Sequence, residues 1–506
     1  MGLDWSTQHY DNYRTGWNPN ERTLTVADVR QRFRLLFTVP VDGQLYAQPL
    51  YVEGLAIPGS GSHNVVYAAT EGNSVYAFDG DTEGTPLWQR RLMAPGETTV
   101  PILDLANCNN VSPQVGITST PVIDRPTETL FVVAKSKQVA GAGATYHQRL
   151  YALDLASGAD KHPPVDLAAS VRGTGDGHDS TGQIAFNPLW HLNRPGLLLT
   201  NGALYIAFGA HCDFQDYHGW ILKYEAATLR PAGAFNTTPD YDPATTVFAG
   251  HGGGIWQSGM GLAASNSGYI YALVGNGPFN GHTGGHDYGN TALRLHPDLT
   301  VADYFTPFDQ DTLNRADRDL GSGGAMLLPA QTGPHPSLLV GCGKEGTIYL
   351  MDRLNMGHYN GPYGPDHVVQ SLPRAIGGIW GGPAYYHGPS GPVVYYCGSD
   401  GHLKAFALAN GKLTLAGQSS TTFRGGFTPT VSSQAGTSGT GIVWGITRSD
   451  PLTLVAHDAT DLGVEVFNGA AGPWNNPTGG AFMTPTVING KVYVGTADRL
   501  AVFGLR

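Results

Sequence analysis

The chain has 506 residues, a formal net charge of −11 and 70 glycines, which is about twice the usual share of glycine. The acidic balance argues against a nucleic-acid partner, and no run of about 20 apolar residues is present that would span a membrane. Abundant glycine with few charged residues predicts many short strands and tight turns. The opening MGLDWSTQHY lacks the pattern of a signal peptide, so an exported protein would have its leader outside this sequence.

One unit of sequence recurs along the chain. It begins with a small residue and proline, continues as an apolar strand and a polar turn, and ends as a second strand near an aspartate. Apolar and polar residues alternate within each copy, and Gly or Asp stands at the turns, as expected for antiparallel strands. Eight copies are present, at residues 48–79, 120–154, 204–225, 269–295, 338–352, 393–408, 428–458 and 484–504.

Eight such copies predict an all-β, eight-bladed β-propeller of four-stranded antiparallel blades, because each copy has the length of one small sheet. No linker is apparent, so residues 1–506 are expected to form one domain. Residues 1–45 precede the first copy and are predicted to pack on the last blade, where they supply an outer strand that closes the ring.

Polar residues recur at two offsets that face the axial funnel of a propeller. After the second strand of the copies stand Glu71, Lys135, His211 with Asp213, Asn276, Lys344, Asp400, Arg448 and Asp498. Before the first strands stand Tyr46, Gln114, Arg194, Trp256, Asp319, Arg374 and Arg424. Several basic residues stand at these positions in an acidic protein: Lys135, Lys344, Arg374, Arg424 and Arg448. They predict a site for a small anionic or sugar-like ligand, while solvated charges on the rim are the alternative.

Cysteines and histidines leave several possibilities open. Cys108, Cys212, Cys342 and Cys397 are widely spaced, so one or two disulfides are possible, and free buried thiols are the commoner outcome. No CxxCH motif is present, so no haem is attached through such a motif. Five histidines gather around the third and fourth copies, where a metal site, a general base or plain loop residues are the alternatives: His211, His218, His251, His282 and His286.

Four short motifs resemble the pyrroloquinoline quinone (PQQ)-dependent alcohol and glucose dehydrogenases. GIWQSGMG places Trp256 where that family stacks a tryptophan beneath the quinone, and GNGPFN places Asn276 where an asparagine binds calcium. ADRDLGSGG places Asp319, or Asp317, near the catalytic aspartate that takes the alcohol proton. GKEG places Lys344 where a basic residue polarises a quinone carbonyl. The resemblance extends along the chain from GWNPNERTLTVADV near its start.

The resemblance also has gaps. The family's vicinal disulfide has no counterpart at Cys108, Gln114 or Val115 stands where an arginine is expected, and the glutamate expected near Tyr46 is missing. The calcium-binding glutamate of the third copy is missing too, and Asp213 and Asp216 lie nearby but out of register. The expected metal ligands are therefore Asn276, Asp319 and Asp213. Arg374 and Arg424 join Trp256, Asn276 and Lys344 as expected cofactor contacts.

Three functions follow from these features. The first is a quinoprotein-like oxidoreductase of an alcohol or sugar that uses PQQ and calcium, works outside the cytoplasm and passes electrons to a separate acceptor. The second is a quinone-free enzyme that cleaves an acidic saccharide by elimination, with His211 or His218 moving a proton. The third is a non-catalytic propeller that binds a protein or a glycan. The four matching motifs favour the first.

Overall fold

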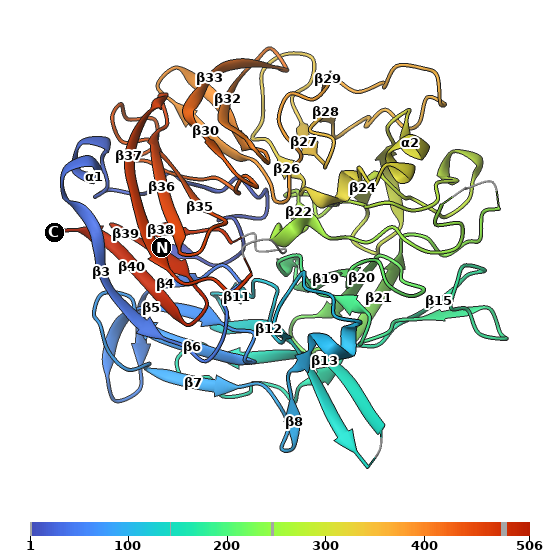
Figure 1. Cartoon of the computed structure of the whole chain (residues 1–506), viewed down its shortest axis with the longest axis horizontal. Coiled ribbons are helices and arrows are strands. Elements are labelled where there is room, and N and C mark those ends of the chain that lie inside the picture. The colour runs from blue at the N-terminus through green and yellow to red at the C-terminus, as the bar shows by residue number, and fades with distance from the viewer. Residues whose placement is uncertain (1–2, 142, 244–246, 477–482) are drawn as a thin grey trace.

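The computed structural model describes residues 3–141, 143–243, 247–476 and 483–506. Within these residues, eight sheets of four or five strands surround a common axis, which confirms the predicted eight-bladed propeller (Figure 1). The core strands of each sheet are antiparallel.

The first four blades follow the chain from its first repeat, and their strands run from the axis outward. Blade 1 contains β4 (Leu50–Ile57), β5 (Gly61–Ala69), β6 (Ser74–Asp79) and β7 (Trp88–Arg91). Blade 2 contains β11 (Val122–Asp124), β12 (Thr129–Ala140), β13 (Gly143–Asp154) and β14 (Val165–Asp166). Blade 3 contains β17 (His191–Leu192) and β18 (Leu198–Thr200), β19 (Ala203–Ala210), β20 (Trp220–Glu225) and β21 (Pro231–Asn236). Blade 4 contains β22 (Ala263–Ala264), β23 (Ile270–Leu273), β24 (Ala292–Leu295) and β25 (Val301–Phe305).

The remaining four blades complete the ring. Blade 5 contains β26 (Met326–Leu327), β27 (Leu338–Cys342), β28 (Ile348–Asp352) and β29 (Gln370–Leu372). Blade 6 contains β30 (Ala384–Gly388), β31 (Gly391–Cys397), β32 (Gly401–Ala409) and β33 (Lys412–Phe423). Blade 7 contains β34 (Thr430–Ser432), β35 (Ile442–Thr447), β36 (Leu452–Asp458) and β37 (Asp461–Gly472). Blade 8 contains β38 (Thr486–Ile488), β39 (Lys491–Gly495), β40 (Arg499–Leu505) and β3 (Phe33–Pro40).

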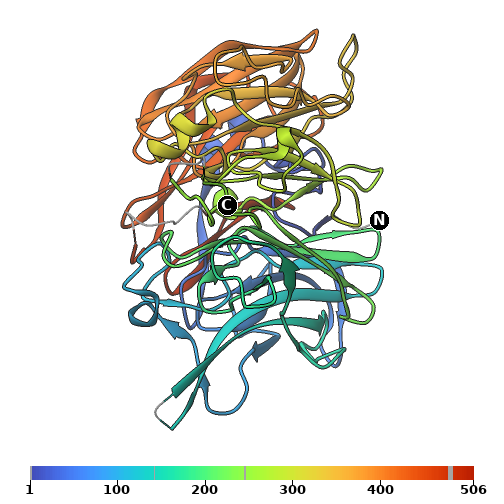
Figure 2. The ribbon, with the colours of Figure 1, turned by 90° about the vertical axis from the view of Figure 1, so that its right-hand side faces the viewer.

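Elements outside the blades were not predicted from the sequence. Two helices, α1 (Val26–Arg32) and α2 (Gln310–Arg315), flank the sheets, and short helical turns lie at η1 (Ile102–Leu105), η2 (Gln257–Gly259), η3 (Gly281–Thr283) and η4 (Leu320–Ser322). Two small ribbons join β9 (Val100–Pro101) to β10 (Gln114–Val115) and β15 (Ser170–Arg172) to β16 (Gln183–Ala185). β8 (Glu97–Thr98) pairs with β12, whose long hairpin with β13 projects from the ring (Figures 1 and 2).

Position within a blade determines how a strand's sequence looks. Every residue of β19 is buried, because each blade packs between two neighbours and both faces of its inner strands are covered. The outer strand β37 instead alternates buried and exposed residues, since one of its faces meets water. The inner strand β19 is therefore a continuous apolar run, which corrects the alternation of apolar and polar residues predicted for every copy.

The segment before the first repeat closes the ring as predicted, because β3 pairs with β40 of blade 8. It also contacts the other blades. β1 (Asp4–Trp5) pairs with β4 of blade 1, and β2 (Trp17–Asn18) pairs with β34 of blade 7. Between them, backbone carbonyls accept hydrogen bonds from the inner strands of blades 2, 4, 5 and 6: Ser6 from Ile123, Asn12 from Ala264, Tyr13 from Leu327 and Thr15 from Tyr385. Among the described residues no helix has the length and apolarity to cross a membrane.

Candidate active site

A cavity of about 370 Å³ opens at one end of the ring. Its walls come from loops that precede the first strand or follow the second strand of blades 2 to 7, which are the two offsets chosen from the sequence. The lining residues are Asn110, Val111, Leu192, Arg194, Asp213, Trp256, Ser258, Asp319, Ser322, Lys344, Trp380, Ser399 and Arg448. Four residues predicted from the sequence for catalysis or for binding cofactor and metal thus meet there: Asp213, Trp256, Asp319 and Lys344.

Asp319 and Lys344 form the charged centre of this cavity. The Lys344 ammonium lies 2.7 Å from Asp319 Oδ2 and 2.7 Å from Asp317 Oδ1. The Asp319 side chain is only 6% exposed, whereas that of Asp317 is 70% exposed. The second oxygen of Asp319, Oδ1, is buried and accepts no hydrogen bond within the described part of the chain. One carboxylate oxygen is therefore held by the lysine, and the other is buried without a hydrogen-bond partner among the described residues.

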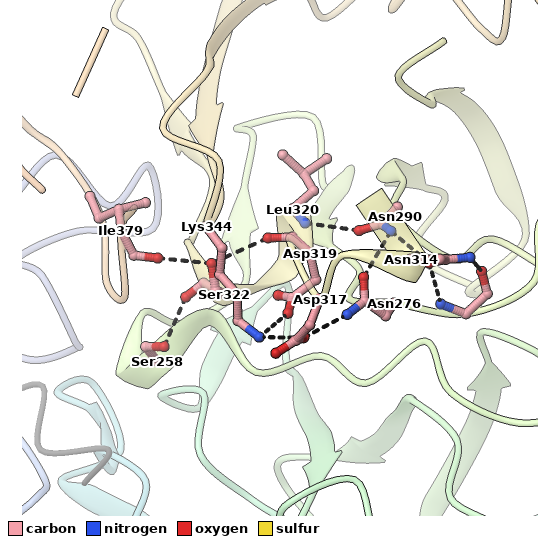
Figure 3. A network of polar contacts seen from close by, with 11 residues as sticks. Ser258, Asn276, Asn290, Asn314, Asp317, Asp319, Leu320, Ser322, Lys344 and Ile379 are labelled. Carbon is pink, nitrogen blue, oxygen red and sulfur yellow. Dashed lines mark hydrogen bonds and ion pairs between the residues drawn. The ribbon is translucent and has the colours of Figure 1, made fainter. Parts of the chain in front are cut away.

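Amides behind the cavity fix this pair (Figure 3). Asn276 Nδ2 donates to Asp317 Oδ1 at 2.9 Å, and Asn290 Nδ2 donates to Asn276 Oδ1 at 3.0 Å. Asn290 Oδ1 in turn accepts from the Leu320 backbone at 2.9 Å, directly after Asp319. The asparagines that end β23 and precede β24 thus orient the aspartate loop of the next blade.

The floor of the cavity is built around Trp256. A Cβ on Gly209 would lie 2.8 Å from the indole ring, and one on Gly254 would lie 2.7 Å from its Nε1. A Cβ on Gly275 would lie 3.1 Å from the ring. The ring of Tyr217 packs edge-on against the indole, and the three glycines leave room for it where it lines the cavity. This arrangement is suited to a tryptophan that presents a flat surface to a ligand.

Burial and charge shift the pKa values of the lining groups. Burial raises the pKa of Asp319, and the nearby Asp317 and Asp213 add to this, while Lys344 opposes it. Burial also raises the pKa of Asp213. Burial would lower the pKa of Lys344, yet Asp319 and Asp317 together raise it, so the ammonium stays charged. Three cations, Arg194, Lys344 and Arg448, therefore face two carboxylates across the cavity.

Comparison of the chain with known proteins finds the same architecture among solved structures. No family model matches the sequence, and no curated protein matches it. Among solved structures, a quinohemoprotein alcohol dehydrogenase from Pseudomonas putida HK5 matches with a TM-score of 0.64 and 15% identity, over 99% of this chain and 80% of that chain. A europium-containing methanol dehydrogenase matches with a TM-score of 0.62 and 13% identity, over 99% of this chain and 98% of that chain. The chain has the propeller fold of the PQQ-dependent dehydrogenases. At these identities the likeness concerns the fold.

Within this PQQ-dehydrogenase fold, the two predicted catalytic histidines lie outside the cavity lining. His211 is buried with Nε2 at 2.8 Å from the Lys135 ammonium, and burial with that charge lowers its pKa well below the usual value. His218 is held between Thr238 Oγ1 at 3.0 Å and the Asp176 carbonyl at 2.9 Å. Both rings therefore serve the packing behind the cavity wall, which corrects the expectation that they face a substrate.

The predicted basic residues also divide into separate places. Lys135 is buried and its ammonium donates to the carbonyls of Leu189 and His191, so it does not reach the cavity. Arg374 is 74% exposed and lies 4.0 Å from Glu345. Arg424 lines a neighbouring cavity instead. Of the expected cofactor contacts, only Trp256 and Lys344 line the main cavity, while Asn276 supports it from behind.

The residues fit a flat anionic quinone better than they fit calcium. The indole floor and the three cations suit a planar ring system that carries carboxylates. Calcium takes six to eight oxygen ligands, but the described residues contain no group of three or more His, Cys, Asp or Glu placed to bind a metal. The Asn276 oxygen already accepts from Asn290, and Lys344 occupies the position between Asp317 and Asp319. The expected set Asn276, Asp319 and Asp213 is therefore not assembled, and no catalytic step is assigned to a metal.

A disulfide braces the cavity wall. Cys108 and Cys212 are joined across 104 residues of sequence, so the expectation of free thiols is wrong for this pair, whereas Cys342 and Cys397 are free and buried. Asp213 follows Cys212, and Asn110 lies two residues beyond Cys108; both line the cavity. The bond thus links the loops of blades 2 and 3 at the site, although the two cysteines are not vicinal.

Seven lining residues were not among the candidates from the sequence: Asn110, Val111, Leu192, Ser258, Ser322, Trp380 and Ser399. A signal for Trp380 was present, because GGIW at residues 377–380 repeats GGIW at residues 253–256. The serines carry no such mark. Ser258 Oγ donates to the Ser322 carbonyl at 2.8 Å, a contact that only the assembled ring creates (Figure 3).

Proposed function

We propose that the protein is a quinone-dependent oxidoreductase that removes hydrogen from an alcohol group bound in the main cavity. The observation that carries this proposal is Asp319, whose Oδ2 is paired with Lys344 while the buried Oδ1 has no partner among the described residues. A buried carboxylate oxygen without a partner is costly, and it marks a place where a ligand donates a hydrogen bond. An alcohol hydroxyl is such a donor.

The chemistry of this pair follows from its geometry. The Asp319 carboxylate, which lines the cavity, would accept the hydroxyl proton as the C–H bond breaks, so it acts as general base. Lys344 fixes the carboxylate by its other oxygen and keeps a positive charge where negative charge develops. PQQ, when bound, would supply the acceptor for the hydride. Trp256 would form the surface beneath the flat ring, and Arg194 and Arg448 would neutralise its carboxylates.

The elimination alternative has less support. It needs a histidine or tyrosine that faces the substrate, and His211 and His218 are both held behind the cavity wall. The carboxylate–ammonium pair favours the oxidoreductase.

The first experiment is a titration of the purified protein with PQQ, with and without calcium, followed by tryptophan fluorescence. We expect saturable quenching in both series, and loss of most of it in Trp256→Ala. Trp88→Phe is the matched control, because Trp88 lies on the outer strand β7 and should keep full quenching. Dye reduction with a panel of alcohols and sugars then measures turnover. Absence of quenching at high micromolar PQQ, or equal quenching in Trp256→Ala, would contradict the proposal.

The same proposal implies a location and a partner. A disulfide persists in oxidising compartments, so Cys108–Cys212 supports a place outside the cytoplasm. With no CxxCH motif in the sequence, we propose that the electrons leave to a separate acceptor protein. Cell fractionation with antibody detection tests the location, and recovery of the protein with the cytoplasmic fraction would contradict it.

A further inference from the structure

A second cavity, of about 770 Å³, lies beside the first, between blades 6 and 7. Ser399 and Arg448 line both cavities, so the two form one continuous surface. Each has the size of a site for a small organic ligand. A small alcohol that reacts at Asp319 would leave the second cavity unused, and this space calls for a longer ligand.

Arg448 is firmly seated at the junction of the two cavities. Its Nη2 donates to the Gly425 carbonyl at 3.0 Å, and a Cβ on Gly425 would lie 2.2 Å from that same nitrogen. Gly425 has φ of +72°, a conformation that glycine adopts without strain. The loop after β33 therefore leaves room for the guanidinium to lie flat against the backbone, between the two cavities.

The lining of the second cavity can form many hydrogen bonds with the hydroxyl groups of a ligand. Hydroxyls and an amide dominate its lining, contributed by Thr421, Thr422, Thr447, Ser449, Thr453 and Asn468. Two arginines and two aspartates also line it, so their formal charges cancel. Phe423 lies beneath the lining, where it is buried against Phe427 and His457. Donors and acceptors in this density, without net charge, match a neutral chain that carries many hydroxyls.

We propose that the second cavity is a subsite for the extended part of a polyhydroxylated chain, a linear oligosaccharide or polyol, whose terminal alcohol reaches Asp319. This inference rests on the proposed function for the position of the reacting end, and it names the substrate class. A ligand that spans both cavities gains contacts with each added unit, until the second cavity is filled.

The test is a measurement of affinity against chain length. Linear α-1,4 and β-1,4 glucose oligomers and oligogalacturonates of one, two, four and six units are titrated into the full chain by calorimetry. In at least one of the two glucose series we expect affinity to rise at least tenfold from one unit to four. If length has no effect in either glucose series, or if no glucose oligomer binds, the subsite proposal is overturned. A preference for the oligogalacturonates would also overturn it, because a neutral lining gives no reason for one.

Thr422→Trp fills the second cavity, and Thr414→Trp is its matched control. Both threonines are exposed on β33, so the bulky side chain is tolerated at either position, but only Thr422 lines the cavity. We expect Thr422→Trp to abolish the gain with length while single-unit affinity stays within twofold, and Thr414→Trp to match the unaltered protein. Equal behaviour of the two variants would overturn the proposal.

Turnover separates the two proposals. Rising oligomer affinity without dye reduction would leave the subsite standing and reject the oxidoreductase. Turnover of small alcohols without any length dependence would do the opposite.

Discussion

The two ends of the axis treat buried polar groups in opposite ways. Along the N-terminal segment, Arg14 is fully buried and all three guanidinium nitrogens donate, to the carbonyls of Leu262, Gln8 and Leu197 and to Thr7 Oγ1. The two ring nitrogens of His9 lie 2.7 Å from the Arg14 carbonyl and 2.8 Å from the Pro429 carbonyl, and the neutral ring donates to one of the two. At the cavity, by contrast, Asp319 Oδ1 is buried without a partner among the described residues.

The N-terminal segment and the cavity contact neighbouring parts of the same chain segments. Inner-strand residues that bind the N-terminal segment, Ala264, Leu327 and Tyr385, lie five or six residues beyond the cavity residues Ser258, Ser322 and Trp380. The chain passes from the cavity into the inner strands β22, β26 and β30 within these few residues, so the two regions are neighbours along the same segments. Neighbouring parts of the same segments thus contact an arginine whose three guanidinium nitrogens all donate, and an aspartate with one oxygen that has no partner among the described residues. We expect the hydrogen bonds of Arg14 to stabilise the fold, and the carboxylate of Asp319 to interact with a substrate.

The largest expected effect on stability comes from removing the hydrogen bonds that Arg14 donates at the N-terminal segment. Arg14→Ala leaves several buried carbonyls without donors, so we expect the free energy of unfolding to fall by about 3–5 kcal/mol, as measured by denaturant titration. Arg30→Ala is the control, because Arg30 is exposed on α1 and its loss should change stability by less than about 0.5 kcal/mol. Similar effects of the two substitutions would remove the distinction between the two ends.

The largest expected effect on activity comes from replacing Asp319 in the cavity. Asp319→Asn keeps the shape of the side chain but removes the base, so we expect kcat to fall by about 100-fold or more, with little change in stability. Asp317→Asn is the matched control, since Asp317 shares the same lysine but is 70% exposed, and its kcat should stay within about fivefold. If both substitutions cost the same activity, Asp319 is not the base.

The ring could be predicted from the sequence because its signals are local. The same unit of strand, polar turn and strand recurs eight times, and eight repeats define eight blades, although inner strands such as β19 are apolar runs and do not alternate as predicted. The path of the N-terminal segment could not be predicted, because its hydrogen bonds use backbone atoms. Ser6, Tyr13 and Thr15 contribute carbonyls, which every residue type offers equally.

Part of the cavity lining could be predicted from the sequence. Trp256, Asp319 and Lys344 follow from the resemblance, Arg194, Asp213 and Arg448 follow from the loop offsets, and all six line one cavity. Loop offset alone failed for Lys135 and His211, which occupy funnel positions yet turn toward each other at 2.8 Å in the interior. Whether a side chain at a given offset faces the axis or the neighbouring blade depends on the packing of loops, which a repeat pattern does not encode.

The disulfide offers a smaller test of how the cavity wall is held. Cys108→Ser with Cys212→Ser releases a loop of 104 residues, and we expect the free energy of unfolding to fall by about 2–4 kcal/mol. A reducing agent should lower the stability of the unaltered protein by a similar amount and leave the double variant unchanged. If the reducing agent destabilises the double variant equally, the bond does not brace this wall.

The smallest effects are shifts in pH dependence, and they distinguish Asp319 as a base from Asp319 as a structural residue. A base must be deprotonated, so kcat/KM should fall as pH falls through the pKa of Asp319, which burial raises above the usual value for aspartate. Lys344 lowers that pKa, so Lys344→Gln should move the acid limb to higher pH. Asp317 raises it, so Asp317→Asn should move the limb to lower pH.

The opposite directions of these two shifts are the decisive feature. Loss of positioning or of local stability would lower activity in both variants but would leave the acid limb in place or move it the same way in both. Only a titrating group that feels both charges shifts upward when the ammonium is removed and downward when the carboxylate is removed. Profiles of kcat/KM against pH for the unaltered protein and the two variants therefore test whether the Asp319 carboxylate takes the substrate's proton.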